Sequence, residues 1–198
     1  MAKQETIKKE LIKKKKKVWI PLMAPSLFNH TEVGETLAEN AKETIGRKVS
    51  IGLGVITKQP RRNVVSVGFI VDSAKEGVGY CSVISFSLSS AQIKRVVRKG
   101  KTRIDESFML TTKDGVSVRV KPLMITSNIV SGGIESKMRK EVKAFLGEYI
   151  SGLTYEGVLE AYLAQDIQSK SKEKLRKVYP LSFFEIRELK KVEKVSHP

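Results

Sequence analysis

The spacing of hydrophobic and polar positions changes along this chain. Between residues 47 and 126, branched and aromatic residues recur in short runs with partial period-two alternation, which is typical of half-buried β-strands. From residue 134 onward, apolar residues recur at helical spacing instead. Links that contain proline, glycine and charged residues separate these runs. The pattern therefore predicts a sheet followed by helices, an α+β fold.

The β pattern predicts one meander, one hairpin and a final strand. Asp114-Gly115, between two apolar runs, indicates the hairpin turn. The last segment alternates again and is expected to return to the sheet. We expect an antiparallel, barrel-like sheet with helices packed at one side. The segments are 47–57, 63–72 and 77–87 for the meander, 102–112 and 116–127 for the hairpin, and 182–189 for the last strand.

Four helices are predicted. Ser89 can cap the first, with Gln92 at the capping-box position and Gly100 suited to the end. Its apolar residues, Ile93, Val96 and Val97, share one face and leave the basic residues on the other. After a glycine-containing joint at 131–133, helical spacing predicts a helix over 134–149. Thr154 is expected to begin the next helix, and Ser171 a short last helix that ends before Pro180.

The N-terminal residues 1–17 carry eight lysines and two glutamates. This composition predicts either an arm that lies along RNA or a disordered, solubilising tail. Pro21 and Pro25 prevent a continuous helix, so residues 19–29 should run extended while their apolar side chains pack on the body. We expect an arm at 1–17 and a single α+β domain at 18–195.

Charge is the strongest global property of the chain. It has 198 residues, with 37 Lys and Arg against 21 Asp and Glu, which gives a formal net charge of +16. Such an excess attracts polyanions, so nucleic acid is the leading partner. There is no signal-peptide stretch and no run of ~18 apolar residues for a membrane span. With the single cysteine, this favours a soluble protein in a reducing cytoplasm.

The sequence offers few groups for catalysis. His30 and His197 have no carboxylate or cysteine neighbours at metal-ligand spacing, and Cys81 lies where a small buried side chain is common. The glycine pairs at 52/54 and 77/79 lack the third glycine that opens a nucleotide-binding helix; the first pair indicates a bulge or bend. We expect no catalytic residue, no metal and no cofactor.

Basic side chains gather on several separate predicted elements, as expected of a protein that contacts phosphates of several RNA segments. Residues 151–168, in contrast, hold three acids and no base, and should face solvent or another protein. The candidate RNA-binding residues are Lys13, Lys14, Lys15, Lys16, Lys17, Trp19, Lys58, Arg61, Arg62, Lys94, Arg95, Arg98, Lys99, Lys101, Arg103, Lys137, Arg139, Lys140 and Lys143.

Ordered motifs from the arm to the last strand resemble one known family. The lysines lead to Trp19, Ala24, Pro25, Phe28 and Asn29, and later matches are 35–37, 46–49, 88–99, 111–115 and 178–181. This arrangement is similar to that of the archaeal and eukaryotic small-subunit ribosomal protein family S3Ae, also called eS1. The chain ends soon after Lys194, without the long extension of eukaryotic members, which favours an archaeal source.

The resemblance implies a structural, non-enzymatic component of the small ribosomal subunit. Its expected place is the platform near the messenger exit, with ribosomal RNA, neighbouring ribosomal proteins and messenger RNA as partners and no membrane. Trp19 would then pack in the core or stack on a base. The alternative is an RNA-processing accessory protein or enzyme that captures RNA on its basic surface. An interaction module acting through 151–168 is compatible with the ribosomal hypothesis.

Overall fold

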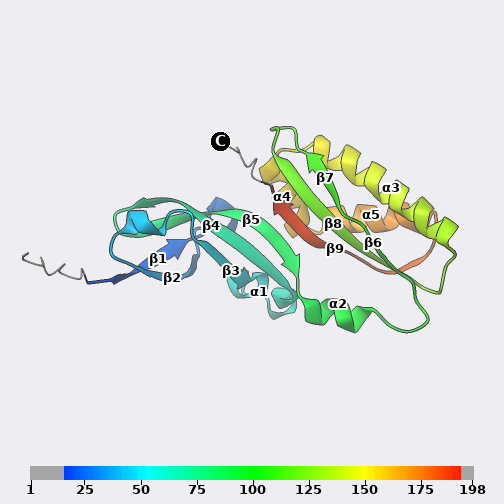
Figure 1. Cartoon of the computed structure of the whole chain (residues 1–198), viewed down its shortest axis with the longest axis horizontal. Helices are drawn as coiled ribbons and strands as arrows, with labels where there is room; N and C mark the ends of the chain where they lie inside the picture. Colours follow the sequence, from blue (N-terminus) through cyan, green and yellow to red (C-terminus); the bar gives the residue numbers. More distant parts are fainter. Residues whose placement is uncertain (1–15, 193–198) are drawn as a thin grey trace, which may run out of the picture.

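The computed structural model of the chain describes residues 16–192 as an elongated molecule, with two halves joined along one sheet (Figure 1). The strands are β1 Val18–Met23, β2 Glu32–Ala38, β3 Lys48–Gly52, β4 Val65–Lys75, β5 Val78–Leu88, β6 Arg103–Asp105, β7 Phe108–Thr111, β8 Ser117–Thr126 and β9 Leu181–Lys191. The helices are α1 Leu53–Ile56, α2 Ser90–Val96, α3 Gly132–Ser151, α4 Tyr155–Leu163 and α5 Asp166–Arg176. Three 3₁₀ turns are η1 Ser26–Phe28, η2 Ala41–Thr44 and η3 Pro60–Val64.

The α+β prediction is confirmed. The strand order runs β2-β1-β5-β9-β8-β6, with β4 paired to β5, β3 to β4, and β7 to β8. The antiparallel meander of β3, β4 and β5 is present as predicted. The β7–β8 hairpin also forms, although the strand predicted over 102–112 is divided into β6 and β7, which both pair with β8. β9 returns to the sheet between β5 and β8. Helices α3, α4 and α5 lie together on one side of the second half (Figure 1).

The predicted antiparallel, barrel-like closure is not what forms, because the sheet is open and mixed. β1 runs parallel to β5 at Leu22 and Met23. β5 pairs with β1 near its start and with β9 near its end, so the sheet continues into the second half instead of closing. Within the described residues β2 and β3 do not pair as strands, but Arg47, just before β3, donates to Thr36 Oγ1 at 2.6 Å and to Leu37 O at 2.9 Å.

Several local predictions differ from the structure. The strand predicted over 47–57 ends at Gly52, and residues 53–56 form the helical turn α1, since a short apolar run suits either state. The last helix begins at Asp166 and not at Ser171, which is fully buried within α5. Strand β2 has no predicted counterpart, because only Val33 and Ala38 of its residues are buried and the alternation is therefore weak.

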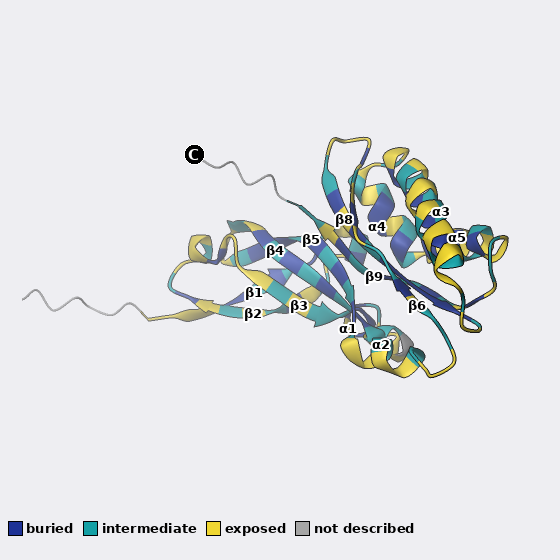
Figure 2. Cartoon of the chain, turned by 45° about the vertical axis from the view of Figure 1, so that its right-hand side comes forward, coloured by how far each residue is buried: buried dark blue, intermediate teal, exposed yellow. Residues whose placement is uncertain are grey.

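One buried cluster includes residues of both halves. Across the central strands, Val67 on β4 faces Phe86 on β5, which faces Leu189 on β9 and then Val120 on β8. The Phe86 ring stacks on Tyr162 of α4 with centroids 4.6 Å apart. The outer face of α3 is exposed while its inner residues are buried (Figure 2). The helices cover one face of this part of the sheet, and polar side chains such as Arg119 and Lys121 of β8 lie on the other face.

Candidate nucleic-acid interface

Helix α2 presents the clearest of the predicted basic surfaces. The Gln92 amide donates to Ser89 Oγ at 3.3 Å, so the predicted cap at Ser89 is confirmed, although the helix ends at Val96. α2 lies on the connection from β5 to β6, at the outside of the molecule (Figure 1). The four basic side chains predicted for its outer face are exposed and form no ion pair within residues 16–192: Lys94, Arg95, Arg98 and Lys99.

The next two basic residues have partners inside the protein. Lys101 Nζ donates to Ser182 Oγ at 2.5 Å. Arg103 forms an ion pair with Asp105. A hollow of about 390 Å³ runs beside α2 and is lined by Arg95, Arg98 and Lys101 together with Ser182. Lys101 therefore links the charged end of α2 to the start of β9.

The basic residues of α3 also divide into exposed lysines without an ion pair in the described chain and one arginine that is paired with acids. Lys137, Lys140 and Lys143 are exposed. Arg139 instead lies 3.2 Å from Glu135 and 3.6 Å from Glu106, so its charge is balanced within the chain. The helix buries the side opposite its lysines against the sheet, which fixes the direction in which they point.

The candidates in the first half are dispersed. Lys16 and Lys17 are exposed, while Lys13, Lys14 and Lys15 lie outside the described residues. Trp19 is 62% exposed opposite Leu37 of β2, so it does not pack in the core. Lys58 is exposed. Arg62 is half-buried and donates to Leu163 O at 3.2 Å, and the side chain of Arg61 lies outside the description.

The most concentrated basic site was missed by sequence reasoning. A groove of about 420 Å³ lies where β3, β5, β8 and β9 meet. Its lining contains five basic side chains and one acid; we call it the basic groove. These residues are Lys48, Arg119, Lys121, Lys190, Lys191 and Glu188.

Strand register explains the electrostatics of the basic groove. Lys121 pairs with Glu188 in the β8–β9 register, and their side chains form a 2.5 Å ion pair. Two residues along each strand, on the same face, Arg119 lies directly opposite Lys190. Like charges in direct cross-strand contact are destabilising, so this position favours a bound anion. Neither of these two residues has an acidic partner within the described chain.

A weak sequence signal exists for the basic groove. Ser117, Arg119 and Lys121 alternate with buried Val118 and Val120, which places the basic residues on the sheet face away from the helices. The contribution of β9 lies in a stretch of interleaved charges that resembles an ordinary solvated face. Only strand pairing brings the two segments together.

The titratable groups with altered pKa are buried or half-buried. Burial, with a smaller contribution from Asp72, raises the pKa of the Cys81 thiol to about 11, which keeps it in the unreactive thiol form. Burial also raises the pKa of Glu185, opposed by the hydrogen bond from Gln168. His30 is exposed in a turn, and His197 lies outside the described residues. Within residues 16–192 no cluster of His, Cys, Asp and Glu could hold a metal ion, and no helix there could cross a membrane.

Comparison with known proteins relates this chain with its basic surface to a protein family. Residues 5–195 match the profile of the ribosomal S3Ae family. The chain belongs to the ribosomal S3Ae family. The S3Ae match includes part of the arm as well as both halves of the sheet, and it confirms the resemblance carried by Trp19 to Asn29 and the later motifs.

Several curated proteins resemble the chain over most of its length. The small ribosomal subunit protein eS1 of Methanopyrus kandleri is 29% identical over 183 residues, covering 90% of this chain and 87% of that protein. Those of Nanoarchaeum equitans and Methanothermobacter thermautotrophicus are each 27% identical, over 88% and 87% of this chain and 88% of each relative. The relatives are thus archaeal and of similar extent.

Proposed function

We propose that this S3Ae protein is a structural constituent of the small ribosomal subunit that binds ribosomal RNA through several basic surfaces. The observation that carries the proposal is the basic groove, in which Arg119 and Lys190 face each other without an acidic partner in the described chain. An RNA phosphate between them would convert a repulsion into two charge-assisted hydrogen bonds. The names of the archaeal relatives support the ribosomal context.

The distribution of charge supports binding of folded RNA through its phosphates. The basic groove, α2 and the lysines of α3 lie on separate elements, so one RNA-bound protein would contact several backbone segments. Trp19 is the exposed aromatic nearest the arm, and its ring is available for a base or a ribose. The protein holds RNA segments together and carries out no reaction.

The position that we propose within the subunit is the platform, near the messenger exit, with ribosomal proteins and messenger RNA adjacent. This proposal rests on the family resemblance and places the protein in the cytoplasm. The RNA-processing alternative would need a convergent set of reactive groups. The altered pKa values instead belong to buried groups in the packing of the chain: Cys81, Tyr155, Tyr162 and Glu185.

Sedimentation of cell lysate at low and high salt tests the proposal. We expect the protein to travel with small subunits at low salt. The double variant Arg119→Ala/Lys190→Ala should dissociate at lower salt. Each lost phosphate contact should lower the slope of log affinity against log salt by roughly 0.7 to 0.9. Purified subunit RNA titrated with the protein gives this slope directly.

A matched control removes two lysines that already have partners. The ammonium of Lys170 lies 5.1 Å from the Tyr149 ring centroid, and that of Lys174 lies 5.0 Å from the Phe145 ring centroid. Lys170→Ala/Lys174→Ala changes the net charge equally and should leave the slope closer to that of the parent. A freely soluble pool of parent protein at low salt would overturn the proposed function.

A further inference from the structure

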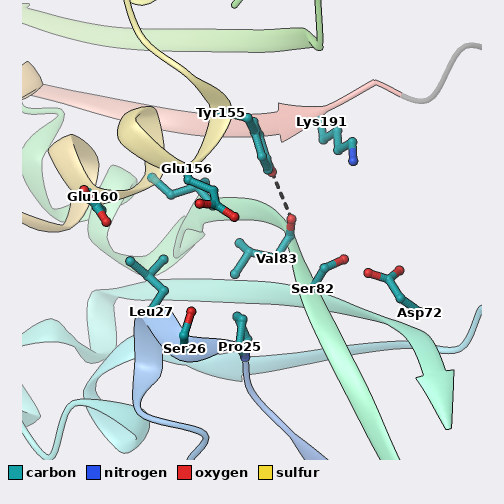
Figure 3. A pocket seen from close by; sticks show the side chains of 11 residues that line it. Pro25, Ser26, Leu27, Asp72, Ser82, Val83, Tyr155, Glu156, Glu160 and Lys191 are labelled. Atoms are coloured by element: carbon teal, nitrogen blue, oxygen red, sulfur yellow. Dashed lines mark hydrogen bonds between the residues drawn. The ribbon is translucent and has the colours of Figure 1, made fainter. Parts of the chain in front are cut away.

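A second groove, of different character, lies between the two halves. It has a volume of about 260 Å³ and is lined by η1 and β5 from the first half and by α4 and β9 from the second. Figure 3 shows Leu27 and Val83 at its apolar base, with Glu156 and Glu160 of α4 pointing toward the space. We call it the acidic groove.

The walls of the acidic groove are held in place by contacts across the halves. The Tyr155 hydroxyl of α4 donates to Val83 O of β5 at 2.9 Å (Figure 3). The ammonium of Lys191 lies 5.5 Å from the centroid of the Tyr155 ring, so this cation is engaged at one end of the groove. The shape is therefore formed before any partner arrives, which favours binding of a side chain in a defined direction.

The charge of the acidic groove is opposite to that of the protein. Its lining carries Asp72, Glu156 and Glu160, all exposed, in a chain of net charge +16. None of the three forms an ion pair in the described part of the chain. Glu156 is explained by its place in the first turn of α4, where the helix dipole favours an acid. Glu160 lies one turn later, at the i,i+4 position, where two like charges repel.

The acidic groove excludes several kinds of ligand. Carboxylates repel phosphates, so RNA is disfavoured here. The acids do not form a group that could hold a metal ion, by the same search of residues 16–192. A volume of about 260 Å³ lies below the range of ~300 to 1,000 Å³ typical of sites for small-molecule ligands. An extended cationic side chain with an apolar neighbour fits both the acidic rim and the apolar base.

We propose that the acidic groove binds a segment of a neighbouring basic protein, with an arginine or lysine between Glu156 and Glu160 and an apolar residue on Leu27 and Leu159. This inference rests on the proposed function, which supplies a setting of basic proteins. The groove thereby gives the chain a protein-binding face distinct from its RNA-binding faces. It also gives the acidic segment 151–168 a specific role.

Site-directed photocrosslinking in assembled small subunits tests the proposal. The full chain carries p-benzoylphenylalanine in place of Ser26, an exposed residue at the edge of the acidic groove. We expect crosslinking to a basic segment of one other subunit protein, identified as a peptide by mass spectrometry. The double variant Glu156→Gln/Glu160→Gln should lower the yield at least fivefold. The control Glu148→Gln/Glu173→Gln, with exposed helix acids outside this groove, should not change the yield.

The outcomes separate this inference from the proposed function. If the labelled chain assembles into subunits but crosslinks to RNA, to its own residues, or to nothing, the acidic groove does not bind a protein segment and the ribosomal role stands. Crosslinking that is insensitive to the two glutamines would also overturn the inference. Failure of the unlabelled parent to enter subunits would overturn the proposed function itself.

Discussion

Glu185 on β9 shows how a single half-buried residue shapes the junction of the two halves. Its Oε1 accepts a hydrogen bond from Gln168 Nε2 of α5 at 3.0 Å. Close by, Tyr162 Oη and Gln168 Oε1 are buried without a hydrogen-bond partner in the described structure. Burial raises the pKa of Glu185, so its charged form is disfavoured relative to the unfolded chain.

Glu185→Gln should therefore stabilise the protein at neutral pH. A carboxyl whose pKa is raised on folding contributes its full stability below the unfolded pKa of about 4.3 and loses it as pH rises through the folded value. The amide does not titrate, and it can also donate to Gln168 Oε1. In urea unfolding, the variant should have a higher unfolding free energy than the parent at pH 7. This difference should become smaller as the pH is lowered toward 4. Glu173→Gln, which removes an exposed carboxylate, is the control. An equal gain in unfolding free energy at pH 7 in both variants would contradict the assignment.

At the scale of elements, the short turn α1 shows a backbone packed too closely for any side chain. Its apolar run follows β3 without a break in sequence pattern, yet the chain turns at Gly54. A Cβ at this glycine would lie 2.5 Å from both Gln59 O and Asn63 Oδ1. The glycine is required by close approach of the η3 segment and not by a bulge within a strand.

Gly54→Ala should consequently destabilise the fold. Inserting a methyl group into such a contact costs about 1 to 3 kcal/mol of unfolding free energy. Chemical denaturation measures the loss. Gly132→Ala is the control, because a Cβ there meets nothing within 4 Å, and it should be neutral or slightly stabilising at the start of α3. Equal effects of the two substitutions would contradict the packing described for α1.

The basic side chains of α2 and of the residues directly after it form no ion pairs within the described chain, so we expect that they are not needed for folding. Replacing Lys94, Arg95, Arg98 and Lys99 together by alanine should leave unfolding almost unchanged, since exposed substitutions typically change stability by less than about 0.5 kcal/mol each. RNA affinity should fall, and the salt slope should drop by up to about 2.8 to 3.6 if all four contact phosphates. Filter binding measures both quantities.

Arg62→Ala provides the contrast for the α2 variant. Its guanidinium donates to Leu163 O, so its loss should lower stability with little change in the salt slope. If the α2 variant bound RNA with the affinity and slope of the parent, α2 would not belong to the interface.

At the scale of the whole molecule, the two halves share a core. β5 joins β9 through Ser85, Phe86 and Ser87, and Phe86 also stacks on Tyr162 of α4. The Tyr155 hydroxyl adds a hydrogen bond across the same junction. These contacts support our proposal that residues 18–195 fold as a single domain, even though the outline is elongated.

A single domain predicts one cooperative unfolding transition. Far-UV and near-UV circular dichroism should report the same midpoint, because unfolding of one half would expose the core of the other. Phe86→Ala, which removes a fully buried ring, should cost about 3 to 5 kcal/mol and shift both signals together. Two separated transitions, or a shift confined to one signal, would show that the halves unfold independently.

Much of the fold could be predicted because its information is local. Alternation predicted the β3–β5 meander and β9, the Asp-Gly pair predicted the β7–β8 hairpin, and caps at Ser89 and Thr154 predicted α2 and α4. The opening of the sheet could not be predicted in this way. It depends on β5 exchanging partners from β1 to β9, which no local pattern encodes.

The candidate site also has features that follow from local sequence and features that depend on contacts between distant segments. The sequence by itself determined that the chain carries a large positive charge, that α2 and the residues directly after it carry four basic side chains, and that the acids of 151–168 stand apart, because charge and helical periodicity are properties of neighbouring residues. Only the tertiary structure decided that Arg119 faces Lys190, that Glu106 lies beside Arg139, and that Glu156 and Glu160 border an apolar groove. Strand register and packing between distant segments set these distances, and electrostatic energy depends on distance.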